Sequence, residues 1–362
     1  MSERVASLEL LRGIAALAVA TPHYLALERT NSIWNEGLSI LAVEIFFVLS
    51  GFVLAPQIIA TVSSGSVQNL KIFLVRRWVR TIPLYFLSLL IISLLMDHLV
   101  SIEFIQYATY TQNLWKQFNK DEYFPIAWSL SIEEWFYIIF PTFGLLAYHF
   151  FGAHKNFFLV YTLLFISFIT VLRILFGNNF NWGEDVRRVV LFRLDSIAYG
   201  FLSFYLIIKF KKNYEKFNLR KFLIALVFLC IIFSGYSGYI LYQIATENSY
   251  LAKAIYPILA SFLGICIVLL FLKLAIFIKS NRTLSNFGFF IGKMSYPIYL
   301  FHLIIAILIQ PNINFLPIEY QFFIYLPVLF FACAIIHYLF ELPILSLRPK
   351  SKTYSDNTMN FQ

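Results

Sequence analysis

Long apolar stretches alternate with short polar segments along almost the whole chain. A helix that crosses the hydrocarbon core of a bilayer needs about 20 apolar residues, and charged residues gather between the stretches that approach this length. The pattern predicts an all-α, polytopic membrane protein with about ten transmembrane helices. They are expected near residues 8–28, 37–60, 82–100, 131–150, 157–176, 188–208, 221–242, 252–273, 286–309 and 321–345.

Composition supports the same class of protein. Hydrophobic residues make up 60% of the 362 residues and charged residues 13%, about half of the roughly 25% that is typical of soluble domains. A soluble globule needs more charge to cover its surface, which excludes an ordinary soluble enzyme, a disordered protein and a disulfide scaffold. Cys230, Cys266 and Cys333 lie far apart in apolar runs, so neither a metal site nor a redox pair is expected.

The placement of the positive charges predicts the orientation of the helices. When the connecting segments are assigned alternately to the two sides, one side holds about three times as many lysines and arginines as the other. Basic loops stay in the cytoplasm, so we expect a multi-pass protein of the inner (cytoplasmic) membrane with both termini inside. This asymmetry explains the net charge of +9 without nucleic acid. Residues 1–347 are expected to form one transmembrane domain and residues 348–362 a polar cytoplasmic tail.

The first stretch has a second interpretation. Arg4, the apolar run and Ala18-Val19-Ala20 together resemble a secretory signal peptide with its small-residue cleavage site. Glu9 lies too deep for the apolar core of such a peptide, which favours an uncleaved helix. The intact mass of the purified protein distinguishes the two.

Charged and polar residues inside the stretches are candidates for function, because each charge costs at least about 2.5–3.5 kcal/mol in the membrane. Arg12 and His23 are eleven residues apart. This is about three helical turns, so both side chains fall on one face, about 16 Å apart. Pro22 can kink the helix and open space around the histidine ring. The alternative for His23 is an interfacial histidine at the end of a span.

The second stretch carries Glu44, followed by a run of aromatic and small residues. Glu44 could pair with Arg12 or with a substrate. Further along the same stretch, Ser50 and Gly51 allow the close approach of a neighbouring helix.

A basic cluster, Arg76, Arg77 and Arg80, precedes the third stretch on the predicted cytoplasmic side. The cluster could set the topology by touching lipid phosphates. It could instead bind a phosphorylated cytoplasmic ligand, because arginine binds phosphate through two parallel hydrogen bonds.

The segment from Trp128 to Tyr137 combines aromatic, hydroxyl and acidic side chains. Ser131 and Glu134 have the spacing of a capping box and are expected to begin a helix. Glu133 then remains at the outer surface, on the side of His23, where it could orient a substrate hydroxyl or the imidazole. The preceding loop carries four aromatic residues that could form an interfacial belt or a platform for sugar rings: Tyr107, Tyr110, Trp115 and Tyr123.

Later stretches carry further polar residues. Arg193 and Asp195 could neutralise each other in the sixth stretch. His302 follows Tyr296 in the ninth stretch, in the middle of an apolar run, and needs a buried partner. Glu341 lies in the tenth stretch.

Six motifs, in order, resemble those of the acyltransferase-3 family of integral membrane acyltransferases, and the resemblance covers residues 5–345. The motifs are Leu11-Arg12-Gly13-Ile14-Ala15-Ala16 with His23; Phe46-Phe47-Val48-Leu49-Ser50-Gly51-Phe52; Arg76 to Arg80 with Pro83 and Tyr85; Trp128-Ser129-Leu130 through Glu133, Phe136 and Tyr137; Arg193-Leu194-Asp195 with Gly200; and Ser295-Tyr296 with Tyr299 and His302.

The chain departs from the pattern of the family at several positions. Glu9 and Glu44 stand where aspartate is common, and Leu10, Pro22 and Ile197 are atypical. Many relatives carry an additional extracytoplasmic hydrolase-like domain. We expect transfer here to be completed by the membrane domain or by a separate partner.

The resemblance implies transfer of an acyl group, usually acetyl, from cytoplasmic acetyl-CoA or another acyl-CoA to a hydroxyl of a cell-surface or lipid-linked carbohydrate. Acyl-CoA would be a substrate, and no permanently bound cofactor is expected. The expected partners are membrane lipids, acyl-CoA and the carbohydrate. Lipopolysaccharide, exopolysaccharide, a lipid-linked sugar and a small glycan all remain open as acceptors, and the oligomeric state is open as well.

The expected roles follow the motifs. His23 is expected to act as general base, with Arg12 and Glu133 completing the catalytic group. The donor is expected to bind Arg12 and the basic cluster, namely Arg76, Arg77 and Arg80. The acceptor is expected to contact Trp128, Ser131, Arg193, Tyr296, His302 and Glu44. A transporter or flippase for an anionic or lipid-linked glycan is the alternative, although the sequence shows neither repeats nor paired broken helices.

Overall fold

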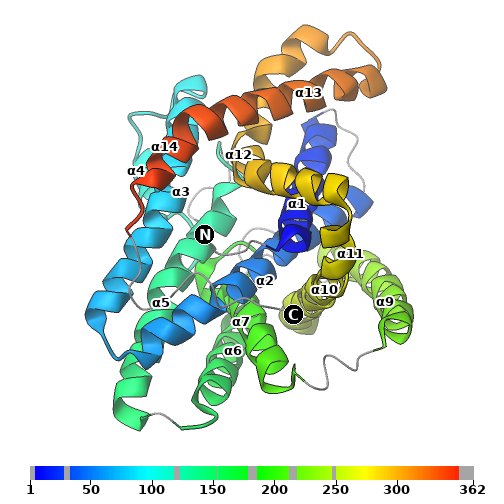
Figure 1. The fold of residues 1–362 in the computed structure, drawn as a ribbon. Coiled ribbons are helices and arrows are strands. Elements are labelled where there is room, and N and C mark those ends of the chain that lie inside the picture. Colours follow the sequence, from blue (N-terminus) through cyan, green and yellow to red (C-terminus); the bar gives the residue numbers. More distant parts are fainter. Residues whose placement is uncertain are drawn as a thin grey trace.

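The computed structural model describes residues 5–27, 33–117, 123–152, 154–177, 186–211, 218–246 and 250–349. All regular structure within these ranges is helical (Figure 1), so the predicted all-α class is confirmed. The longer helices are α1 (Ala6–Leu27), α2 (Ile33–Ser63), α3 (Val67–Leu95), α5 (Ala127–Phe151), α6 (Phe157–Phe176), α7 (Leu194–Lys209), α9 (Leu219–Thr246), α10 (Tyr250–Lys273), α12 (Arg282–Ile313) and α13 (Ile318–Ile336). Shorter elements are α4 (Ile102–Ala108), the 3-10 turn Val190–Phe192, α11 (Ala275–Ser280), the π-helical turn His337–Glu341 and α14 (Leu342–Ser346).

In the described ranges, nine helical spans are long and apolar enough to cross a membrane. They coincide with nine of the ten predicted stretches. The remaining stretch, 221–242, lies in α9, whose shorter segment Lys221–Ile232 is apolar. The chain is therefore a multi-pass membrane protein. The orientation stays a prediction, and the predicted tail lies outside the described residues from position 350 onward.

Two helices begin earlier than their apolar stretches. Helix α3 begins at Val67, after Ser66, whose hydroxyl accepts from the backbone N–H of Asn69. The basic cluster therefore lies inside α3 rather than before it, because lysine and arginine are good helix formers and extend the helix beyond its apolar part. Helix α5 begins at Ala127. Ser131 is thus an interior residue, and the predicted capping box with Glu134 is wrong.

The centre of the bundle is formed by α1, which packs along both α12 and α2, while α2 also packs along α7 (Figure 1). The contact between α2 and α7 depends on two glycines. A Cβ at Gly51 would lie 1.9 Å from the carbonyl oxygen of Ile197, and one at Gly200 would lie 2.0 Å from that of Val48. Only glycine permits this separation, which confirms the close approach predicted at Gly51.

The last helices run across one end of the bundle. In Figure 1, α13 continues through the π-helical turn into α14, which lies beside α3. This packing brings the end of the described chain to the basic cluster, where the guanidinium of Arg76 donates to the carbonyl of Pro349.

Candidate functional site

A pocket lies among five helices, α1, α2, α3, α5 and α12, and holds about 800 Å³ of empty space including its open mouth. Among the side chains that the structure describes, none from α9 or α10 lines it. The polar or aromatic side chains that line it are Arg12, Phe46, Phe47, Ser50, Arg77, Arg80, Thr81, Ser129, Glu133, Tyr137, Ser295, Tyr296 and Tyr299.

One end of the pocket is basic. Arg12 from α1 and Arg77 and Arg80 from α3 line it. The Nη2 of Arg77 donates to Gln57 at 2.8 Å, and the Nη1 of Arg12 lies 3.4 Å from Glu9. Three guanidinium groups around one open volume can bind a phosphorylated ligand. Arg76, the fourth expected donor-binding residue, does not line the pocket, since it is bonded to the C-terminal segment described above.

The middle of the pocket contains one carboxylate. Glu133 accepts hydrogen bonds from Ser50, at 2.8 Å, and from the hydroxyl of Tyr137. The adjacent acid, Glu134, points elsewhere and lies 2.5 Å from the hydroxyl of Thr81. Glu133 is therefore the acidic residue of α5 that faces the pocket; the sequence analysis expected it at the outer surface, on the side of His23.

Tyr296 also lines the middle of the pocket. Its hydroxyl donates to the backbone carbonyl of Thr81 at 2.8 Å. This contact ties α12 to α3 near the basic end. The phenol is therefore held in place before any ligand binds.

At the other end, beyond the pocket, two histidines meet. The Nδ1 of His23 lies 2.8 Å from the Nε2 of His302, and the two ring planes are inclined by only 15°. The hydroxyl of Ser39 lies 3.4 Å from the Nε2 of His23. His302 is fully buried and His23 half-buried. The buried partner that His302 requires is thus the histidine of α1, and the His23 ring faces the bundle.

The hydrogen bonds of His302 show which nitrogen of each ring carries the proton when both histidines are neutral. Its Nδ1 lies 2.8 Å from the carbonyl oxygen of Tyr299 and 3.1 Å from that of Ile298. Carbonyl oxygens only accept, so Nδ1 of His302 carries the proton and its Nε2 must accept. The Nδ1 of His23 therefore donates to His302. The Nε2 of His23 is left with a lone pair, on the side of Ser39.

Two expected acceptor contacts lie outside the pocket. Ser131 is buried and accepts from the side-chain amide of Gln112 at 2.6 Å. Trp128 packs edge-on against Phe47, and the guanidinium of Arg187 lies 5.4 Å from its ring centre. Both residues stabilise the start of α5, and their expected contact with a substrate stays a prediction.

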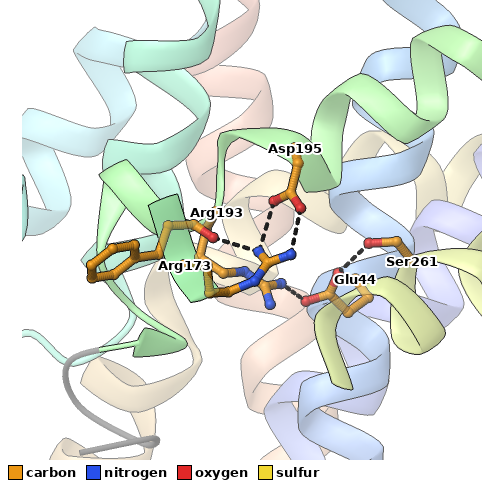
Figure 2. Close-up of polar contacts among 6 residues, drawn as sticks. Glu44, Arg173, Arg193, Asp195 and Ser261 are labelled. Atoms are coloured by element: carbon orange, nitrogen blue, oxygen red, sulfur yellow. Dashed lines mark hydrogen bonds and ion pairs between the residues drawn. The ribbon is translucent and has the colours of Figure 1, made fainter. Parts of the chain in front are cut away.

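Glu44 and Arg193 also lie away from the pocket, in an ionic network at the junction of α2, α6, α7 and α10 (Figure 2). Arg193 pairs with Glu44, which also accepts from Ser261 at 3.1 Å. Arg173 pairs with Asp195 at 2.8 Å and donates to the carbonyl of Phe192. The expected neutralisation of Arg193 by Asp195, and the pairing of Glu44 with Arg12, are replaced by these two ion pairs.

The sequence analysis gave no role to three residues that line the pocket, Ser129, Tyr137 and Thr81, or to Ser39 beside His23. Ser129, Glu133 and Tyr137 are spaced by four residues, so they share one face of α5. That polar stripe was a readable signal in the sequence. Thr81 and Ser39 gave no such signal, because each is a single hydroxyl at the edge of an apolar run.

The aromatic residues of the loop before α5 are mostly packing residues. Tyr107 and Tyr110 are buried, and Tyr110 stacks on Tyr85 with ring centres 4.5 Å apart. Burial raises the pKa of the Tyr110 hydroxyl well above its ordinary value, so this phenol stays protonated. Trp115, in contrast, is 59% exposed. Neither Tyr107 nor Tyr110 is available as an open sugar platform.

Comparison with known proteins gives a family and several relatives. A family model described as an acyltransferase domain matches residues 5–341. The chain is 27% identical over 303 residues to "Putative acetyltransferase ORF330" of Acidianus two-tailed virus, covering 81% of each chain. It is 29% identical over 208 residues to "Putative peptidoglycan O-acetyltransferase YrhL" of Bacillus subtilis, covering 52% of this chain and 32% of the relative.

A third relative is "Putative O-acetyltransferase SACOL0978" of Staphylococcus aureus. The two chains are 25% identical over 324 residues, and the alignment covers 50% of the relative. The chain therefore spans about a third to a half of these two bacterial relatives. No solved structure matches the chain.

Proposed function

The chain belongs to the acyltransferase-3 family of membrane acyltransferases, and we propose that it transfers an acetyl group from cytoplasmic acyl-CoA to a hydroxyl of a cell-surface or lipid-linked carbohydrate. The names of its relatives support an O-acetyltransferase, and one of them names peptidoglycan. The inner membrane is the proposed location. The two bacterial relatives are longer, so the acceptor and any partner of the whole reaction belong to the proposal as well.

A single arrangement carries this proposal: a pocket that is basic at one end, with a histidine pair beyond the other. The pyrophosphate of CoA is anionic and suits Arg12, Arg77 and Arg80. The pantetheine arm is thin and extended, so it can follow the pocket between the helices. The thioester would then approach the histidines, while the acceptor would arrive from the opposite side.

The protonation of the histidine pair supports His23 as general base. Its Nε2 lone pair accepts the proton of the acceptor hydroxyl while the hydroxyl oxygen attacks the thioester carbon. The C–S bond breaks, and the proton passes from Nε2 to the departing thiolate, which leaves as CoA. His302 acts as a positioning residue, because it holds the Nδ1–H of His23 and favours the positive ring that forms.

Negative charge develops on the thioester oxygen during the attack and needs hydrogen-bond donors nearby. Among the candidates from the sequence, Arg12 and Tyr296 line the pocket. Ser131 does not, since its hydroxyl is engaged by Gln112. Arg12 lies at the basic end with the phosphates, so we propose Tyr296 for this role, with its hydroxyl turning from the Thr81 carbonyl to the thioester oxygen.

Replacement of His23 tests the proposal. His23→Ala should lower acetyl transfer about 10²–10⁴-fold, the usual contribution of a positioned base, without loss of folded, membrane-inserted protein. The measurement is release of CoA from acetyl-CoA by membrane vesicles, together with glycan masses of cells that carry either version. Only the wild-type cells should contain glycans heavier by one acetyl group. Substrate flux without CoA release would favour a transporter or flippase instead.

Two variants of His302 separate positioning from packing. Gln offers an acceptor to the Nδ1–H of His23, whereas Leu offers none. His302→Gln should therefore retain more kcat than His302→Leu, while KM for acetyl-CoA stays unchanged in both. Equal kcat in the two variants would show that the contact with His23 does not matter for the reaction.

A further inference from the structure

One residue of the pocket lining, Tyr299, also contacts the histidine pair. Tyr299 lines the end of the pocket, and it lies one helical turn before His302 on α12. The Tyr299 carbonyl accepts from the Nδ1 of His302, and the two ring centres are 6.2 Å apart. Neither histidine lines the pocket. The Tyr299 ring thus lies both at the pocket and beside the histidine pair.

Contacts from two other helices hold this ring in place. Its hydroxyl lies 2.5 Å from that of Ser129 and 3.2 Å from the carbonyl of Ile126, at the start of α5. Phe46 from α2 packs edge-on against the ring, with centres 5.7 Å apart. Tyr299 is only 6% exposed. The end of the pocket is therefore closed by α2, α5 and α12 together.

We infer that the Tyr299 ring, supported by Phe46, sets the length of the acyl group that the enzyme accepts; the inference rests on the proposed function. A donor that enters at the basic end presents its acyl group to this ring. A short acyl group ends before the ring, whereas each additional methylene must take space that the ring fills. An apolar pocket discriminates by about 10–200-fold for each methylene.

The same position makes Tyr299 a gate. The acyl carbon reaches the acceptor hydroxyl at His23 only when the ring turns away from Ser129. The hydrogen bond between Tyr299 and Ser129 would hold the ring in this position until the acceptor binds. Water from the acceptor side is then kept from an unused thioester. The gate changes no bond of the reaction; it only controls when the thioester meets the base.

Binding of CoA thioethers tests the inference without an acceptor. The probes are S-ethyl-CoA and S-butyl-CoA, which differ by two methylenes, measured by titration calorimetry on the purified full chain. The wild type should bind S-ethyl-CoA at least about tenfold more tightly than S-butyl-CoA. Tyr299→Ala should reduce that preference about tenfold or more. Tyr161→Ala is the matched control, because it removes a partly buried tyrosine of α6 that lies outside the pocket.

Each result decides between distinct conclusions. An unchanged preference in Tyr299→Ala, with binding retained, would overturn the inference and leave the proposed function intact. A wild type that binds neither probe would overturn both. If Tyr299→Ala does not elute as a single peak from a size-exclusion column, Tyr299→Leu and Phe46→Ala replace it. The same loss of preference for S-ethyl-CoA over S-butyl-CoA is expected in both variants. Turnover of butyryl-CoA relative to acetyl-CoA should rise by a similar factor.

Discussion

The bundle contains two groups of buried charged side chains, and they are organised differently. In the ionic network of Glu44, Arg173, Arg193, Asp195 and Ser261, two arginines meet two carboxylates, and the paired side chains are at most 2% exposed (Figure 2). None of these residues lines the pocket described above.

In the pocket, three arginines surround an open volume, and the facing acid, Glu133, is held by hydroxyl groups. Charges that satisfy one another hold helices together, while charges grouped around a space can bind a ligand. The charges of the ionic network thus connect helices, whereas those of the pocket can bind a ligand. Burying either group in a membrane costs free energy.

The largest effect on stability is expected in the ionic network. Glu44→Leu leaves Arg193 buried without its carboxylate, which should destabilise the protein by about 3–5 kcal/mol. Thermal unfolding in detergent measures this loss. The double variant Glu44→Leu with Arg193→Met should recover much of it, because apolar residues of similar volume often replace a buried ion pair without penalty.

The result for Glu44→Leu also tests whether the ionic network is structural and the pocket functional. If Glu44→Leu leaves the unfolding temperature unchanged but abolishes acetyl transfer, Glu44 acts on a substrate, as the sequence analysis expected. The separation between a structural and a functional group of charges would then fail.

The sequence predicted much of the fold but not the choice of partners. Apolar length located the spans, and Gly51 indicated a close helix contact that the structure contains. Arg193 and Asp195 are neighbours in sequence, yet each pairs with a residue of another helix. Partner choice depends on which helices are adjacent, and a single sequence with no contact information does not contain that adjacency.

The candidate site was predicted in parts. Of the three expected catalytic residues, Arg12 and Glu133 line the pocket, and His23 lies beyond it, paired with His302. The role of Tyr299 in closing the pocket was not predictable, because it depends on Ser129 and Phe46 from two other helices.

A smaller effect is expected from the basic end of the pocket. Arg80 is half-exposed, so Arg80→Gln should leave stability unchanged while removing a charged contact with the donor. Charged hydrogen bonds contribute about 1.5–3 kcal/mol, so the Kd for acetyl-CoA should rise about 10–100-fold. Arg76→Gln is the control, because its guanidinium is bonded to the Pro349 carbonyl. A loss as large in Arg76→Gln would mean that the donor contacts the whole basic cluster.

The smallest effect is expected at Ser39. Its hydroxyl lies 3.4 Å from the Nε2 of His23, a long contact at the position that the acceptor hydroxyl would take. Ser39→Ala should therefore lower kcat only a few-fold, in line with a neutral hydrogen bond of about 0.5–1.5 kcal/mol. Release of CoA from acetyl-CoA measures the rate, with His23→Ala as the reference for complete loss. A loss as great as that of His23→Ala, with acetyl bound to the wild-type protein at Ser39, would identify the serine as a nucleophile. The reaction would then proceed through an acyl-enzyme, because a serine beside an oriented histidine is the arrangement that covalent catalysis requires.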